Sequence, residues 1–209
     1  MPPLPDPNGV FLNVPYDEEF SSLYIAYIVG LCQLGLVPHM ASETPGGGRR
    51  LDRIFEHIQS CRYSIPDLSR VELSVTPTAV PRFNMALELG MTITWQKLHP
   101  SRHDWFVWES EPYRIQRSAG DLNGTDACIH NGTPDGFLRE LWSAFWRETM
   151  PSVPRMLENY RFVNNNLNAI LYKKGTSNPY DRSVFMELCW ISKTLADLIR
   201  PTGSAARKP

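Results

Sequence analysis

The sequence lacks the features that direct a chain to a membrane or to nucleic acid. No apolar run in its 209 residues is long enough to span a bilayer, and the stretch from Met1 to Pro7 lacks the basic and apolar regions of a signal peptide. Its 21 basic and 22 acidic residues nearly balance, so a strongly basic surface is not expected. We therefore predict a cytoplasmic protein with neither a membrane nor a nucleic-acid partner.

Cysteine is scarce, and no Cys-x-x-Cys pair is present. The four cysteines are Cys32, Cys61, Cys128 and Cys189. Their wide spacing is typical of small buried apolar residues in a reducing compartment. The five histidines are His39, His57, His99, His103 and His130. They show no metal-ligand spacing, because Pro100 argues against one helical face for His99 and His103, so no metal site is expected.

Glycine-rich cofactor motifs are also missing. Neither Gly-x-Gly-x-x-Gly nor a Walker loop occurs, and Gly46-Gly47-Gly48 has no Lys-Ser/Thr after it, so it is interpreted as a plain loop. A Gly-x-Ser-x-Gly nucleophile elbow is absent too. The sequence therefore predicts no resident cofactor.

Short apolar runs alternate with segments of helical periodicity along most of the chain. Strands are predicted at 10–14, 36–40, 62–65, 105–108 and 127–130, and helices at 18–35, 51–61, 82–96 and 137–145. Such alternation implies parallel strands with right-handed crossovers, and the simplest arrangement is a flavodoxin-like, doubly wound, five-stranded parallel sheet. This α/β domain is assigned to residues 10–150. Two further helices, 155–172 and 181–199, form a helical extension over 151–200, with flexible termini at 1–9 and 201–209.

Polar residues follow several of the predicted strands. They are Asn13, Tyr16 and Asp17 after the first strand, Asp67 after the third and Glu111 after the fourth. Ligands of open α/β sheets bind beyond the carboxyl ends of the strands, at the switch point of the strand order. A ligand site is therefore predicted where these loops converge.

Glu88 is the most informative single residue because it lies within an otherwise apolar helical segment. A carboxylate is costly to bury unless it is paired or neutralised. Its neighbours at helical spacing are Asn84 and Thr92, with no Lys or Arg on that face. Glu88 is thus either a working acid or a core acid whose basic partner comes from elsewhere.

Three motifs together resemble those of a known superfamily. They are Phe11-Leu12-Asn13-Val14-Pro15-Tyr16, Ser64-Ile65-Pro66-Asp67-Leu68-Ser69 and Asn84-Met85-Ala86-Leu87-Glu88-Leu89-Gly90. In this order they resemble nucleoside 2-deoxyribosyltransferases and the related bacterial TIR-like proteins, over residues 10–148. The chain also resembles an uncharacterised subgroup of TIR-like proteins.

The resemblance implies roles for particular residues. Glu88 matches the catalytic glutamate, Asp67 an acid that contacts the base or assists proton transfer, and Tyr16 an aromatic near the substrate. The substrate-binding residues that it suggests are Asn13, Tyr16, Asp17, Ser64, Arg82 and Asn84. The chain departs from the transferase pattern at 80–84, where an Asp and a Gly are expected. Arg82 in that stretch either meets a phosphate, which favours a nucleotide, or pairs with Glu88 or Asp67.

The expected activity is cleavage of the N-glycosidic bond of NAD or a related nucleotide, with NAD as substrate rather than cofactor. By resemblance, such proteins release nicotinamide, some form an ADP-ribose-type signal, and many act in bacterial antiphage defence as homo-oligomers. Two alternatives stay open: a non-catalytic module that binds a nucleotide signal or mediates assembly, and a nucleoside 2-deoxyribosyltransferase.

Overall fold

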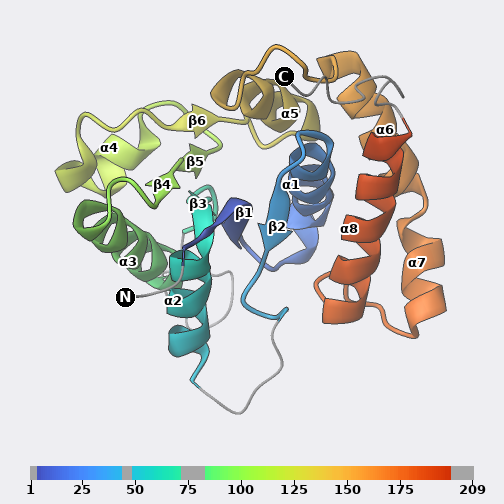
Figure 1. Ribbon diagram of the computed structural model, residues 1–209, viewed down its shortest axis with the longest axis horizontal. Coiled ribbons are helices and arrows are strands. Elements are labelled where there is room, and N and C mark those ends of the chain that lie inside the picture. Colours follow the sequence, from blue (N-terminus) through green and yellow to red (C-terminus); the bar gives the residue numbers. More distant parts are fainter. Residues whose placement is uncertain (1–3, 44–48, 72–82, 199–209) are drawn as a thin grey trace, which may run out of the picture.

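The computed structural model describes residues 4–43, 49–71 and 83–198 and has α/β architecture (Figure 1). The strands are β1 (Asp6–Asn13), β2 (Val37–His39), β3 (Cys61–Pro66), β4 (Asp104–Trp105), β5 (Trp108–Glu109) and β6 (Cys128–Ile129). The α-helices in this part of the chain are α1 (Ser21–Gln33), α2 (Arg50–Ser60), α3 (Phe83–Leu98), α4 (Arg114–Ser118), α5 (Pro134–Ala144), α6 (Val153–Asn165), α7 (Leu167–Lys174) and α8 (Arg182–Asp197). None of the helices among these residues is both long and apolar enough to cross a membrane.

The main sheet has four parallel strands in the order β2-β1-β3-β4, and β5 and β6 form a separate parallel pair. The predicted five-stranded sheet is therefore not confirmed. The predicted fourth strand, 105–108, divides at Phe106 and Val107 into β4 and β5. An isolated parallel bridge between Asp67 and Trp108 links the two sheets.

β1 is longer than the sequence predicted. It begins at Asp6, which pairs with Cys61 of β3, and the register shifts before the next pair, Val10 with Tyr63. Residues 6–9, predicted as part of a flexible lead-in, thus belong to the strand. The predicted flexible tail, 201–209, lies outside the described residues.

Alternation along the central strands divides their side chains between two helical layers. Val10 and Leu12 of β1 pack in the same hydrophobic cluster as α1, whereas Phe11 packs with Ile54 and Ile58 of α2. Helices α2 and α3 lie on one side of the sheet in Figure 1, and α1 lies on the other. A residue's parity in β1 or β3 therefore decides which layer its side chain meets.

The C-terminal helices form a third layer over α1. Every residue of α1 from Leu23 to Gln33 is buried, since α1 packs against the sheet and also against α5, α6 and α8. A buried amide pair supports this contact: Asn159 Nδ2 of α6 donates to Gln33 Oε1 of α1 at 2.9 Å. The predicted helix 155–172 is divided at Asn166 into α6 and α7. The extension thus shares one hydrophobic core with the α/β layers.

Candidate functional site

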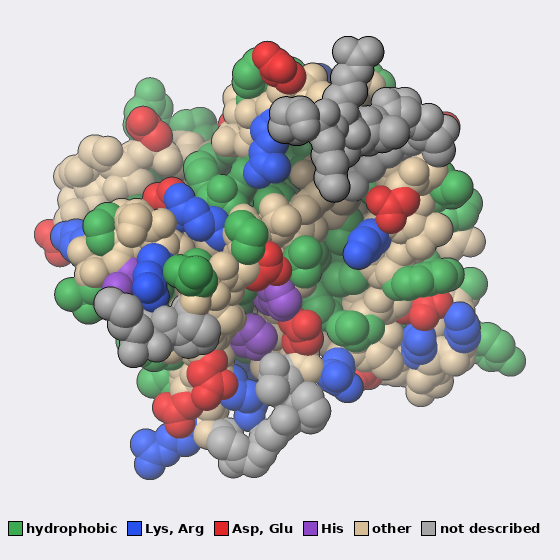
Figure 2. Space-filling model, in the orientation of Figure 1, with side chains coloured by type: hydrophobic (Ala, Val, Ile, Leu, Met, Phe, Trp, Pro, Cys, Tyr) green, Lys and Arg blue, Asp and Glu red, His purple; other side chains and the backbone are tan. Residues whose placement is uncertain are grey.

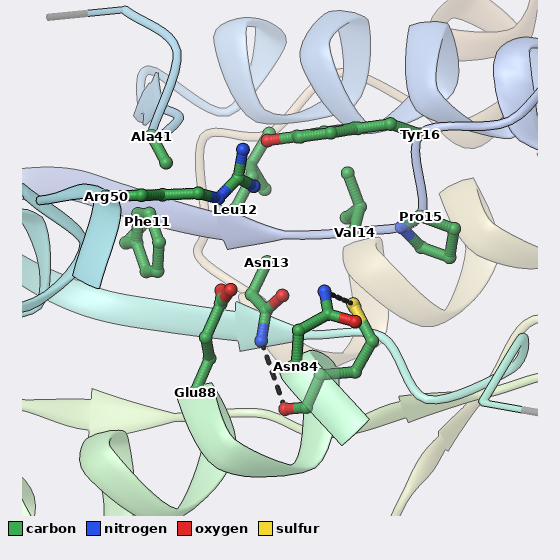
Figure 3. A pocket seen from close by; sticks show the side chains of 11 residues that line it. Phe11, Leu12, Asn13, Val14, Pro15, Tyr16, Ala41, Arg50, Asn84 and Glu88 are labelled. Carbon is green, nitrogen blue, oxygen red and sulfur yellow. Dashed lines mark hydrogen bonds between the residues drawn. The ribbon is translucent and has the colours of Figure 1, made fainter. Parts of the chain in front are cut away.

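A small cavity of about 110 Å³ opens at the carboxyl end of β1, between α2 and α3 (Figure 3). Its lining comes from the end of β1 and the loop after it, from the segment after β2, from the start of α2 and from the first turns of α3. The described lining residues are Phe11, Leu12, Asn13, Val14, Pro15, Tyr16, Ala41, Arg50, Asn84, Met85 and Glu88. The cavity lies where parallel α/β folds place their ligands, beyond a strand's carboxyl end.

Glu88 projects from α3 toward β1 in this cavity (Figure 3). Its side chain is only 5 % exposed. Burial raises the pKa of Glu88 to about 7, although the positive charge of Arg50 acts in the opposite direction. Glu88 is therefore a carboxyl group that changes its charge near neutral pH inside a small cavity.

Arg50 provides the positive charge near Glu88 that no residue on the same face of α3 provides. It begins α2, and Figure 3 shows its guanidinium lying across the cavity from Glu88, near Tyr16. Its Cζ atom is 5.8 Å from the centroid of the Tyr16 ring. Because α2 is far from α3 in sequence, helical spacing around Glu88 gave no sign of this cation.

Asn13 holds the first turn of α3 against the sheet. Asn13 is 5 % exposed, and its Nδ2 donates to the carbonyl oxygen of Met85 at 3.3 Å. Asn84 Nδ2 lies 3.5 Å from the sulfur of Met85 and lines the cavity beside it. Asn13 shares the face of β1 that carries Phe11, which explains why its amide reaches α3.

Tyr16 forms the wall of the cavity opposite α3. Burial raises its pKa to about 12; the charge of Arg50 lowers it, and that of Glu88 raises it further. The hydroxyl therefore stays protonated at neutral pH and can donate a hydrogen bond. Behind Tyr16 lies Tyr180, with ring centroids 5.1 Å apart, so the segment before α8 supports this wall.

Asp17, predicted to bind substrate, instead organises the loop after β1. Its Oδ1 caps the following 3₁₀ turn by accepting from the Phe20 amide, and its Oδ2 accepts from Arg70 Nε at 2.9 Å. Its backbone carbonyl accepts from the Tyr180 hydroxyl at 2.7 Å. Asp17 does not line the cavity.

Asp67 lies on the other side of the sheet from Glu88. Asp67 comes two residues after Ile65, so its side chain points to the same face of the sheet, and Ile65 packs in the α1 layer. The Asp67 side chain is fully buried. The Tyr27 hydroxyl of α1 donates to Asp67 Oδ2 at 2.7 Å, and His130 Nε2 lies 3.2 Å from the same oxygen. The expected grouping of Asp67 with Glu88 and Tyr16 is therefore wrong, because strand alternation turns Asp67 into the core.

Backbone amides contact both side chains of this buried pair. The Gly132 amide donates to His130 Nδ1 at 2.9 Å, so Nδ1 accepts and the ring proton is on Nε2, which faces Asp67. The Ser69 amide donates to Asp67 Oδ1 at 2.9 Å. Asp67 is thus satisfied by a structural network rather than open to a ligand.

The remaining predicted residues also lie outside the cavity lining or outside the described residues. Ser64 lies in the middle of β3 and is 1 % exposed, but it does not line the cavity. Arg82 falls in the stretch 72–82, outside the described residues. Glu111 is an exposed residue 4.0 Å from Arg117, whereas Glu109, which the sequence did not single out, is buried beside Arg114.

A second polar cluster lies next to this cavity. His39, Glu43 and His57 each bring one potential ligand atom within 4.8 Å of the other two. They come from β2, the loop after it and α2, so their spacing in sequence gave no metal-binding pattern. The sequence predicted no group of metal ligands, but the fold brings these three potential ligands together.

No protein-family model and no curated protein matches this chain. What the cavity does has to be inferred from its own side chains. It combines a carboxylate that can ionise near pH 7, a guanidinium, a phenol donor and amide groups, in a hollow too small for a whole dinucleotide. This set can stabilise a cationic sugar and bind a neighbouring anion.

Proposed function

We propose that the protein is a TIR-like, deoxyribosyltransferase-related N-glycosidase that cleaves the bond between base and ribose in NAD or a related nucleotide. The observation that carries this proposal is the Glu88 carboxyl, buried in a cavity at the end of β1 with Tyr16 and Arg50 beside it. The motif resemblance of residues 10–148 adds bacterial antiphage defence as the setting.

The fold proposal is that the two sheets act as one flavodoxin-like sheet in the order β2-β1-β3-β4/β5-β6. Support comes from main-chain bonds between the β3 segment and the stretch that joins β4 to β5: the Phe106 amide donates to the Ser64 carbonyl at 3.0 Å and the Leu68 amide to the Trp108 carbonyl at 2.9 Å. The order of strands would then be that of flavodoxin, 2-1-3-4-5.

The proposed reaction starts from ionised Glu88. As the C1′–N bond of NAD breaks, its electron pair passes to the nicotinamide ring, which leaves as a neutral molecule, and positive charge develops on the ribose. The carboxylate stabilises this charge electrostatically or through a transient ester. Water then forms the new C1′–O bond and loses one proton to solvent, giving ADP-ribose.

We propose for Arg50 the phosphate-binding role that the sequence also suggested for Arg82, which lies outside the described residues. A guanidinium binds phosphate in a bidentate manner, and Arg50 lines the cavity. Ligand pockets for whole drug-sized molecules measure about 300–1,000 Å³. A cavity of about 110 Å³ suits the sugar ring alone, with the phosphates beside Arg50.

A homo-oligomer is proposed on the strength of the exposed apolar side chains of the helical extension. Tyr172 of α7 is 90 % exposed, Trp190 of α8 is 64 % exposed and Phe162 of α6 is 54 % exposed. Figure 2 shows hydrophobic side chains at the surface over this part of the molecule. Contiguous exposed apolar patches are typical of surfaces that associate.

The proposal is tested by incubating the full chain with NAD over a range of protein concentrations and measuring nicotinamide by chromatography. We expect release that increases with pH through about 7, as Glu88 ionises. Glu88→Gln should reduce the rate at least about 100-fold. Glu148→Gln, which makes the same change at an exposed position, should leave it unchanged.

Other results would point to the alternatives. If NAD, nucleotides and deoxynucleosides all stay intact at every protein concentration, the N-glycosidase proposal fails. Saturable nucleotide binding without turnover would then favour the binding module. Base exchange between two deoxynucleosides would identify a 2-deoxyribosyltransferase.

A further inference from the structure

Three side chains near the edge of the main sheet form a cluster with the donor atoms of a metal site. His39 is the last residue of β2, Glu43 lies in the loop after it, and His57 is in the last turn of α2. Their ligand atoms lie within 4.8 Å of one another, and His39 Nδ1 is 3.0 Å from Glu43 Oε2. All three are half-buried, so an ion could enter from solvent.

The surrounding structure holds these side chains in place. The His57 ring stacks on Phe11, with centroids 5.7 Å apart and planes at 3°. His39 is the register partner of Phe11 across the β1–β2 ladder, and its ring centroid lies 6.0 Å from that of His57. The Arg182 guanidinium of α8 donates to the Glu43 carbonyl and so holds the loop that follows β2.

The donor set favours one class of cation. Two imidazoles and a carboxylate are the ligands of zinc sites that keep a fourth position open, whereas calcium and magnesium prefer oxygen ligands alone. Zinc binds such nitrogen and oxygen atoms at about 2.0–2.2 Å, which puts two tetrahedral ligands about 3.4 Å apart. The His39–Glu43 pair is already close to this separation, and side-chain shifts of about 1 Å would bring in His57.

We propose that His39, Glu43 and His57 bind a Zn²⁺ ion and leave its fourth coordination position open. The ion takes the place of the proton shared by His39 and Glu43. One carboxylate leaves the bound dication with a net positive charge, so the open position attracts water, hydroxide or an anionic group. Figure 2 shows two histidine side chains beside acidic ones on the surface over the β2–α2 region.

This site is separate from the Glu88 cavity and does not depend on the proposed N-glycosidase activity. None of its three ligands lines that cavity. The ion would join β2 to α2, and α2 also carries Arg50 at its start. A bound metal would therefore make the full chain more resistant to unfolding.

The test is titration of the metal-free full chain with ZnCl₂ in competition with a chromophoric chelator, together with the absorption spectrum after CoCl₂ is added. We expect one equivalent bound, a higher melting temperature, and the intense visible bands of tetrahedral cobalt without a thiolate charge-transfer band. His57→Gln and Glu43→Gln should each weaken zinc binding at least about 100-fold, since even changes beyond the ligands cost 10–100-fold. The matched control, His99→Gln, should bind as the original chain does.

Several outcomes would overturn the site. Absence of stoichiometric zinc or cobalt binding would do so, as would equal affinity in both ligand variants. A thiolate band would assign the metal to cysteine instead. If His57→Gln does not fold, as judged by circular dichroism, then Glu43→Gln and the cobalt spectrum of the original chain decide the matter.

Discussion

At the scale of single residues, the cavity carries its chemistry on a carboxyl group that folding removes from water. Glu88 is 5 % exposed, and its pKa is raised from 4.5 to about 7, by burial above all. Arg50 offsets only part of this effect. An acid kept in this state costs stability at neutral pH, which is typical of residues retained for function.

The stability of the protein should report this cost through its pH dependence. The folded state keeps the Glu88 proton to higher pH than the unfolded state, so the free energy of unfolding falls as pH rises from about 4.5 to about 7. Glu88→Gln cannot ionise and escapes this loss. Relative to the original chain, the variant should gain about 3 kcal/mol between pH 4 and pH 8.

Urea denaturation of both proteins at a series of pH values measures this difference. Glu148→Gln serves as the control, because it makes the same change at an exposed position. Parallel curves for Glu88→Gln and the original chain would show that Glu88 has an ordinary pKa in the folded protein.

At the scale of elements, α5 begins against the loop that holds His130. Thr133 caps the helix by accepting from the Gly136 amide at 3.1 Å. A Cβ atom at Gly136 would lie 2.2 Å from the His130 carbonyl oxygen, so only glycine fits there. The close approach connects the start of α5 to the buried His130–Asp67 pair.

Gly136→Ala should therefore lower the free energy of unfolding by about 1–3 kcal/mol, because the backbone must move to admit the methyl group. Gly90→Ala is the matched control within α3, where, apart from the helix backbone, no atom of the described residues lies within 4 Å of the added Cβ. There the better helix propensity of alanine should raise stability by up to about 1 kcal/mol. Thermal or chemical denaturation distinguishes them, and equal effects would contradict the close contact at Gly136.

At the scale of the whole molecule, the C-terminal helices belong to the same core as the sheet. Phe185 of α8 is 1 % exposed and lies in one cluster with α1 and β1. Tyr180, just before α8, packs on Tyr16 at the cavity wall. The extension is therefore part of the structure that shapes the site.

A single cooperative transition is expected as a result. Phe185→Ala should destabilise the protein by about 3–5 kcal/mol, whereas Met186→Ala, next to it but 47 % exposed, should change stability by no more than about 0.5 kcal/mol. Far-UV circular dichroism and tryptophan fluorescence should give coincident unfolding curves for both variants. Two separated transitions would mean that the extension unfolds on its own.

Local pattern was enough to predict much of the architecture. The alternation of strands and helices and the helical stripes after Pro151 predicted an α/β protein with a helical end, since these patterns follow from the periods of helix and strand. The division of 105–108 into β4 and β5 was not predicted, because a short apolar run does not reveal where its hydrogen bonding stops.

Part of the candidate site was also predicted from local sequence pattern. Glu88, Tyr16, Asn13 and Asn84 were singled out by sequence, and all four line the cavity. Asp67 was misplaced although its parity with Ile65 was available, because the predicted strand ended before it. Asp17 was taken for a ligand contact when its carboxylate caps a turn and binds Arg70.

The sequence by itself determined that Glu88 sits on an apolar helix face without a basic neighbour one turn away, because that depends only on helical spacing. Only the tertiary structure decided that Arg50 lies beside it and that His39, Glu43 and His57 meet. These groupings join residues from separate elements, so they depend on how the helices cross the sheet, which no local pattern encodes.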